Sequence, residues 1–473
     1  MASDVLAKIL ESVGVQNMIS DSDESENSDD DTKFEVDWVQ RVVSNTRKRS
    51  SGLHSCEKPK KKRQRRWKCR RKLPYSTSMF YKDFHSRTCR VLGHKDAKEF
   101  RLNYRMPWSE ASKLVRQFIE NKWVITQEEC DRRRVKGQKV CPPEIKILAT
   151  LYWLGEGCSF RTIYNLSGRV LSSESFRNFA QKFCRQVTLH LAPEYIKVPD
   201  TVKELRQISK SYEERGFPGA CGSVDGVQIA WEGCPHAYRV SFTGKEKYPT
   251  LGFNVTVGHD YRILHVCSMF AGRFNDKTKV LYDEYVNRLR TDFYDGFTYT
   301  VYDSDGVPST MKIPYLICDG GYHKWLQLMC GFKTTSKEYL SLFSKLLESL
   351  RKDVECTFGV LKKRFKILKV PLLFRDVSFI EDLFITCCVL HNWLLDHDSQ
   401  FNTSQFRVTG RSHDRRRVLV NNVVKLLQKN DDYSYIEQGG LNPETVTQVD
   451  SEFQSVRKRL ATHTYYVFRN RLI

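Results

Sequence analysis

The fold is restricted first by residues 220–231, which read Ala-Cys-Gly-Ser-Val-Asp-Gly-Val-Gln-Ile-Ala-Trp and alternate as a β-strand does. Val227, Ile229 and Trp231 fall on one side of this pattern, and Asp225 falls on the same side. A carboxylate among apolar neighbours needs a cation, a metal ion or a proton. A metal-holding role for Asp225 is therefore one hypothesis. The segment alone favours a structural aspartate, because an aspartate before a glycine is common in turns.

Further alternating segments predict a sheet. Residues 252–257 and 263–270 are rich in β-forming side chains and are joined by a short polar turn, so we expect a hairpin. A second hairpin is expected within residues 297–313. Residues 315–321 resemble a short buried strand that ends in Asp319 and two glycines. Ligands often lie at the carboxyl ends of such strands.

Residues 338–369 carry the strongest helical pattern in the chain. Glu355 lies at the edge of the apolar stripe, about 60° from Phe358 in a helix of 3.6 residues per turn. From there its carboxylate could reach over the sheet. The stripe consists of residues spaced three and four apart, namely Leu340, Phe343, Leu347, Leu350, Val354, Phe358, Leu361, Phe365 and Leu368. Strands combined with such a helix predict an α/β fold, and a further helix is expected at residues 380–395.

The region before the sheet has helical periodicity. We expect helices at residues 108–119, from Pro142-Pro143 to Gly155, at 159–166 and at 172–187, with serines as N-caps of the last two. Arg177, Lys182 and Arg185 fall on the outer face of the last helix. Such helices suit a helix-turn-helix on DNA, and a small bundle with a solvated basic face fits equally well.

The charge of the chain suggests a polyanionic partner. Its 473 residues include 77 basic and 56 acidic ones, a net charge of +21. Residues 21–31 are a serine-rich acidic run that cannot pack, so we expect a disordered tail. A basic cluster follows it. This cluster predicts a nuclear-import signal or a phosphate contact, with a merely solvated tail as the alternative, and it contains Lys58, Lys60, Lys61, Lys62, Arg63, Arg65 and Arg66.

Cysteine usage and hydropathy indicate a reducing compartment and no membrane span. The 15 cysteines include no C-x-x-C pair, so reduced core thiols are expected. Cys387 and His391 have helical i, i+4 spacing, but core packing is favoured over a metal site because only two ligands are visible. No uninterrupted apolar run approaches the roughly 20 residues of a membrane helix, and no secretory signal is seen at the N-terminus. We therefore expect a soluble intracellular protein.

An ordered set of motifs between about residues 81 and 395 resembles the transposase of PIF/Harbinger DNA transposons, in particular its plant-transposon-protein branch. The combination is more specific than any one motif. The segments are Gly222-Ser223-Val224-Asp225-Gly226, Cys234-Pro235, Gly252-Phe253-Asn254, Gly272 with Asp276, Leu316-Ile317-Cys318-Asp319, residues 354–365 and Cys387-Cys388-Val389-Leu390-His391-Asn392.

The resemblance implies a ribonuclease-H-like catalytic domain whose mixed sheet is flanked by helices. Asp225, Asp319 and Glu355 would match the D, D, E acids that hold metal ions, Mg²⁺ or Mn²⁺, most simply as two ions. Asp276 would match a further acid and could be a fourth ligand. This sequence has Ala271-Gly272-Arg273 where the family has Pro-Gly-Ser. His323 could contact DNA, although a satisfied or surface histidine is favoured.

The resemblance also implies the domain plan and the partners. We expect a tail at 1–74, a helix-turn-helix-like domain at 75–195, a nuclease domain at 215–396 and a basic linker with C-terminal helices at 397–473. Expected partners are double-stranded DNA, namely transposon terminal repeats and target, and a Myb/SANT-like accessory protein. A homo-oligomer and nuclear localisation are also expected. Further DNA contacts are predicted at Lys362, Lys363 and Arg364, at the basic end of the long helix.

The predicted function is that of a DNA transposase, or an endonuclease derived from one. The chain would cleave and join phosphodiester bonds by a two-metal mechanism. The first alternative is a catalytically silent, domesticated DNA-binding or chromatin-associated protein on the same fold. A third hypothesis, an RNA-processing nuclease, requires a preference for structured RNA over duplex DNA.

Overall fold

The computed structural model describes residues 74–132, 140–333, 335–401 and 448–471. They all lie within one unit of the chain, Arg71–Ile473. The acidic run, the basic cluster at residues 58–72 and a short helix predicted at residues 418–428 lie outside the described residues.

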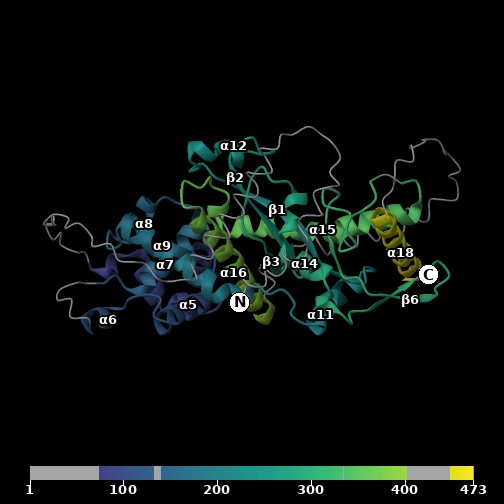
Figure 1. The fold of residues 1–473 in the computed structure, drawn as a ribbon. Coiled ribbons are helices and arrows are strands. Elements are labelled where there is room, and N and C mark those ends of the chain that lie inside the picture. The colour runs from purple at the N-terminus through teal and green to yellow at the C-terminus, as the bar shows by residue number, and fades with distance from the viewer. Residues whose placement is uncertain (1–73, 133–139, 334, 402–447, 472–473) are drawn as a thin grey trace. The chain divides into compact units, whose positions relative to one another are not determined.

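Helices dominate the chain up to the first strand, as predicted (Figure 1). They are η2 (Tyr75–Thr77), α3 (Met79–His85), η3 (Thr88–Arg90), α4 (Lys95–Tyr104), α5 (Trp108–Glu120), α6 (Gln127–Arg132), α7 (Pro143–Glu156), α8 (Phe160–Leu166), α9 (Ser173–Gln186), the π-helical turn η4 (Val187–Leu191), α10 (Ala192–Tyr195) and α11 (Val202–Glu213).

Local signals explain where these helices begin and end. The hydroxyls of Ser159 and Ser172 accept hydrogen bonds from the first turns of α8 and α9, so both predicted N-caps are confirmed. Pro143 stands in the first turn of α7, and Gly157 follows that helix with a left-handed backbone, φ +62°. The four predicted helices are therefore present. Helices α9 and η4 pack against α16 (Val377–Phe401), which comes from beyond the sheet in sequence.

A mixed sheet follows, with the order β3-β2-β1-β7-β8 and with β4 paired to β2. Strands β1, β2 and β3 are antiparallel, whereas β7 and β8 run parallel to β1. Strands β5 and β6 form a separate two-stranded sheet, the predicted second hairpin. The bounds are β1 (Ala220–Ala230), β2 (Thr250–Val257), β3 (Ile263–Val266), β4 (Phe270–Ala271), β5 (Tyr299–Tyr302), β6 (Pro308–Met311), β7 (Tyr315–Ile317) and β8 (Leu328–Met329).

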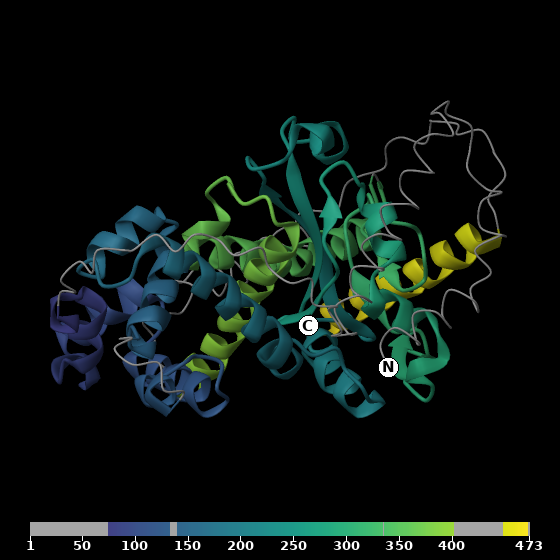
Figure 2. The same cartoon turned by 60° about the vertical axis from the view of Figure 1, so that its left-hand side comes forward.

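Helices flank this sheet, so the protein is mixed α/β. Helix α15 (Glu338–Arg364) contacts β1, β2 and β7, while α18 (Gln448–Arg471) lies beside α15 and β5 (Figures 1 and 2). All nine apolar residues of the predicted stripe are buried. The remaining elements are η5 (His236–Tyr238), α12 (Arg239–Phe242), α13 (Asp276–Leu281), α14 (Glu284–Arg290), η6 (Asp292–Tyr294) and η7 (Lys366–Leu368).

Two predicted elements are interrupted. The strand expected at 263–270 ends at Val266, and Cys267 to Met269 separate it from β4. Residues 276–290 have a helical pattern in the sequence, but the helix is divided, because Asp283 is the N-cap of α14 and accepts a hydrogen bond from the Val286 amide at 3.0 Å.

Helix α16 is long and apolar enough to cross a membrane, although its apolar residues do not form one uninterrupted run. Within its most apolar stretch, Val377–His397, 78% of the test window is buried inside the protein. Burial of this kind is typical of the core helix of a soluble fold, and α16 packs against α9, η4, α10, α15 and β3.

Strand β1 presents its two faces to different helices. Ser223 donates to the Leu350 carbonyl of α15 at 3.3 Å, and Asp225 contacts Arg351 of the same helix. Side chains alternate along a strand, so residue 226 faces the other way. A Cβ atom at Gly226 would lie 2.8 Å from the Asp276 carboxylate of α13. The middle of β1 thus lies between acids from two helices.

Candidate active site

Asp225 lies in the middle of β1, and its side chain is mostly buried but still reaches solvent. Its side chain is 20% exposed, and its Oδ1 accepts a hydrogen bond from the Gly226 amide at 2.8 Å. Val227, Ile229 and Trp231 on the same side of the pattern are buried, as predicted. Asp225 is therefore a charged residue on a strand face whose later residues are apolar.

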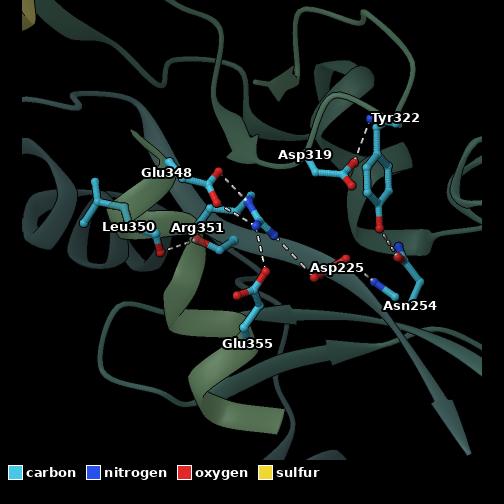
Figure 3. A network of polar contacts seen from close by, with 11 residues as sticks. Asp225, Asn254, Asp319, Tyr322, Glu348, Leu350, Arg351 and Glu355 are labelled. Atoms are coloured by element: carbon cyan, nitrogen blue, oxygen red, sulfur yellow. Dashed lines mark hydrogen bonds and ion pairs between the residues drawn. The ribbon is translucent and has the colours of Figure 1, made fainter. Parts of the chain in front are cut away.

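Glu355 approaches this position from α15 through an arginine. Arg351 donates to Glu355 Oε1 at 2.6 Å, and its Nη1 lies 3.5 Å from Asp225 Oδ2. Glu348 completes the cluster, with Oε1 2.7 Å from Arg351 Nη2 and Oε2 2.9 Å from Nε. Figure 3 shows Glu348, Glu355 and Asp225 around the guanidinium. The structure thus brings Glu355 and Asp225 to one cation.

Asp319 follows β7, which pairs in parallel with β1. Its Oδ1 accepts from the Gly321 amide at 2.8 Å, so the carboxylate closes a tight turn. Tyr322 anchors the same loop by donating to Asn254 Oδ1 at 2.8 Å (Figure 3). Asn254 in turn donates to Asp283 Oδ2 at 2.6 Å. This buried chain of hydrogen bonds fixes the loop that carries Asp319.

The carboxylates influence each other's charge. The pKa of Asp225 is raised to about 6, mainly by burial, and the negative charges of Asp319 and Asp276 contribute to this increase. The Gly226 amide and Arg351 act in the opposite direction. Hydrogen bonds from Arg351 hold the pKa of Glu348 below its ordinary value. Asp225 is thus the acid whose ionisation is opposed most by its neighbours.

Asp276 has a structural partner that the sequence did not reveal. Its Oδ1 lies 3.0 Å from the ammonium of Lys279, whose side chain is only 3% exposed. A buried ammonium requires such a counter-ion. The negative charge of Asp276 therefore acts on Asp225, although the Asp276 carboxylate is paired with Lys279.

The donor set fits hard divalent cations, which prefer carboxylate oxygen. A divalent cation would offset the electrostatic repulsion between Asp225, Asp319 and Asp276. The acids are nevertheless not closed around one point. Among the described residues, Asp225, Asp319 and Glu355 do not form a trio whose ligand atoms all lie within 4.8 Å of one another. Arg351 fills the gap between Asp225 and Glu355, so a shared ion requires that Arg351 release Glu355.

The predicted DNA-contacting residues fall into two groups. Arg177, Lys182 and Lys363 are exposed, although Arg177 also lies 3.8 Å from the Glu174 carboxylate. The other three are only partly exposed and contact protein groups. Arg185 pairs with Asp382 at 3.4 Å, Lys362 donates to the Gln228 carbonyl at 3.2 Å, and Arg364 lies 3.4 Å from His391 Nδ1. The first group is available to a phosphate backbone, whereas the second also braces the fold.

Two histidines named in the sequence have different environments. His391 is buried, its Nε2 lies 3.0 Å from the Tyr261 carbonyl, and burial together with Arg364 lowers its pKa to about 3. It is a core histidine, as the favoured interpretation of Cys387 and His391 predicted. His323 stacks on Trp325 at 4.7 Å, and burial lowers its pKa. None of the described cysteines forms a disulfide, in agreement with the expected thiols.

Sequence reasoning missed Arg351, Glu348 and Lys279. A signal for the first two was present, because residues 348, 351 and 355 are spaced three and four apart and must share a helix face. No comparable signal revealed the Asn254–Tyr322 contact, which joins residues distant in sequence.

Comparison with known proteins supports a transposon-related protein family. Residues 193–402 match the family model of plant transposon protein, and this region contains all the strands and the acids at 225, 276, 319 and 355. No curated protein and no solved structure matches the chain significantly.

Proposed function

Starting from a transposon-related family, we propose that this chain is a DNA transposase of the PIF/Harbinger type, or an endonuclease derived from one. The proposal includes a ribonuclease-H-like fold, which the mixed sheet flanked by helices supports. The observation that carries it is that two acids distant in sequence from Asp225 influence it, one through a shared arginine and one through its charge. Arg351 contacts Asp225 and Glu355, and the charge of Asp319 raises the pKa of Asp225.

Asp225, Asp319 and Glu355 are the residues that would hold Mg²⁺ or Mn²⁺. When bound, two such ions would make a water or a 3′-hydroxyl more nucleophilic and neutralise charge on the scissile phosphate. Cleavage and joining would be in-line displacements without a covalent enzyme intermediate.

The protein residues have distinct tasks in this proposal. Ionised Asp225 and Asp319 supply the negative charge of the site, and the Asn254–Tyr322 bond keeps the Asp319 loop in place. Arg351 balances the charge of Glu355 when no divalent ion is bound. Exposed Arg177, Lys182 and Lys363 would contact DNA phosphates and set the orientation of the duplex. Nuclear localisation, a Myb/SANT-like partner and a homo-oligomer are part of the same proposal.

A second candidate is a silent DNA-binding protein. It is favoured by one observation, the tight pairing of Glu355 with Arg351, which satisfies the glutamate without a metal ion.

One experiment separates the two candidates. The purified full chain is incubated with a labelled duplex that carries the inverted repeats flanking its gene, once with Mg²⁺ and once with EDTA. The proposal predicts strand cleavage only with Mg²⁺, with binding of the duplex under both conditions. Binding without cleavage in either condition would favour the silent protein. Cleavage of structured RNA in preference to the duplex would favour an RNA-processing nuclease.

A further inference from the structure

A second group of metal-binding side chains lies apart from the residues proposed for DNA cleavage. It consists of His265 on β3, Cys267 just after that strand and Asp283 just before α14. Their ligand atoms all lie within 4.8 Å of one another, and His265 Nε2 is 3.5 Å from Asp283 Oδ1. Three ligand types that differ in chemistry thus converge from two separate segments.

The group is enclosed and incompletely satisfied. Cys267 is 4% exposed and Asp283 is fully buried. His265 Nε2 is also buried, yet it makes no hydrogen bond and lies 3.5 Å from Asp283 Oδ1. A buried nitrogen without a partner is costly, so its position next to a thiol and a carboxylate needs an explanation.

The chemical types of these three ligands favour Zn²⁺ over Mg²⁺. A tetrahedral Zn²⁺ with bonds of about 2.0–2.1 Å to nitrogen and oxygen places those two atoms about 3.4 Å apart, close to the separation of His265 Nε2 and Asp283 Oδ1. A neutral imidazole, a thiolate and a carboxylate together carry two negative charges, which balance Zn²⁺ in a buried position. Mg²⁺ prefers oxygen ligands alone and is disfavoured by imidazole and thiolate.

Hydrogen bonds from surrounding groups orient Asp283, and the Cys267 thiol donates to the Tyr282 carbonyl at 3.3 Å, a bond that metal binding would replace. Asp283 accepts from the Val286 amide at Oδ1 and from Asn254 at Oδ2, and each carboxylate oxygen has a second lone pair. Such outer contacts are typical of metal ligands. Burial and the nearby Asp283 charge raise the pKa of Cys267, so the metal-free thiol is protonated and an arriving ion would expel that proton to solvent.

We propose that His265, Cys267 and Asp283 bind a structural Zn²⁺ ion. The ion would join the end of β3 to the start of α14, at the two points where the predicted strand and helix are interrupted. It would also brace the Asp319 loop from a distance, because Asp283 is bonded to Asn254 and Asn254 to Tyr322. None of its three ligands is among the acids proposed for catalysis.

The test is the zinc content of the full chain after dialysis against Zn²⁺ and then against metal-free buffer. We expect the parent protein to retain one equivalent more than Cys267→Ala or His265→Gln. Cys388→Ala, which removes an equally buried thiol on α16, should retain as much as the parent. Asp225→Asn should also keep the ion, whatever its effect on DNA cleavage. Equal zinc content in the parent and in both ligand variants would overturn the proposal.

Cobalt gives a readout on the parent protein itself, should Cys267→Ala fail to fold. Co²⁺ added to chelator-treated protein, with excess Mg²⁺ to fill the acidic site, should produce a thiolate-to-cobalt charge-transfer band. The band should be present in Cys388→Ala and lost or strongly reduced in His265→Gln. A parent protein without the band, or a band unchanged in His265→Gln, would contradict a site made of these residues.

Discussion

The guanidinium of Arg351 lies 2.6 Å from the Glu355 carboxylate, one helical turn away on α15. The same guanidinium reaches toward Asp225, so a cation of the protein occupies the space between two proposed metal ligands. Arg351 therefore acts as a counter-ion for the acids and as a competitor of divalent ions.

Replacing Arg351 should make the stability of the protein depend more strongly on bound divalent ions. In EDTA, Arg351→Gln should lower the free energy of unfolding by about 1–2 kcal/mol, because Asp225 and Glu355 lose a hydrogen-bonded cation and the pairs are partly exposed to solvent. Mn²⁺ should stabilise this variant more than the parent, since the ion no longer competes with the guanidinium. Thermal unfolding with and without Mn²⁺ measures both effects. Lys363→Gln, an exposed change on the same helix, should behave like the parent. Equal stabilisation of Arg351→Gln and the parent by Mn²⁺ would count against competition.

The raised pKa of Asp225 predicts how stability changes with pH. The folded-state pKa of about 6 lies above the ordinary value of 3.8, so between these values the folded state holds a proton that the unfolded state has lost. Stability from this group is full below about pH 4 and falls as the pH rises toward 6. Asp225→Asn should therefore become more stable than the parent by about 2–3 kcal/mol at pH 7 in EDTA, with little difference at pH 4. Urea unfolding of both proteins at the two pH values tests this. A stability difference that does not depend on pH would refute the assignment.

The contact between Asp276 and Lys279 predicts that Asp276 is first a counter-ion. Asp276→Asn should destabilise the fold by about 2–3 kcal/mol, because it leaves an ammonium buried and unpaired. The double variant Asp276→Asn with Lys279→Met should recover most of that loss. A double-mutant cycle of unfolding free energies measures the coupling. Additive effects, with no recovery, would show that Asp276 has a different main role.

The solvent exposure of the basic side chains predicts which of them contribute to DNA binding. Arg177→Ala combined with Lys182→Ala should weaken duplex binding and reduce the slope of log affinity against log salt by about 2, since two phosphate contacts are lost. Arg185→Ala should instead act mainly on stability, because Arg185 pairs with Asp382, which is 8% exposed. Titrations of labelled duplex at several salt concentrations provide the measurement. An unchanged slope in the double variant would exclude this helix face from the interface.

The sequence could predict those elements whose signal is local. Helix α9 was visible from a serine cap and the spacing of Phe176, Phe179 and Phe183, and β1 from the alternation of Val227 and Ile229. Such signals arise within a few residues and survive in the folded protein.

Other features could not be predicted, because polar contacts between distant residues determine them. The helical pattern predicted at residues 451–461 lies within α18, which continues to Arg471. Its next turns are held by His463, which accepts from the Tyr302 amide, and by Thr464, which donates to the Gly216 carbonyl. The pairing of Asp276 with Lys279 was overlooked for a different reason, since no apolar pattern marks a buried lysine.

The most direct test compares Mg²⁺-dependent nicking of the terminal-repeat duplex by the parent protein, Asp225→Asn and Glu355→Gln. Glu232→Gln, which changes an exposed acid just beyond β1, is the matched control. We predict that both site variants lose nicking while they bind the duplex as the parent does, and that the control cuts normally. Nicking by either site variant at the rate of the parent would contradict the proposed acidic site.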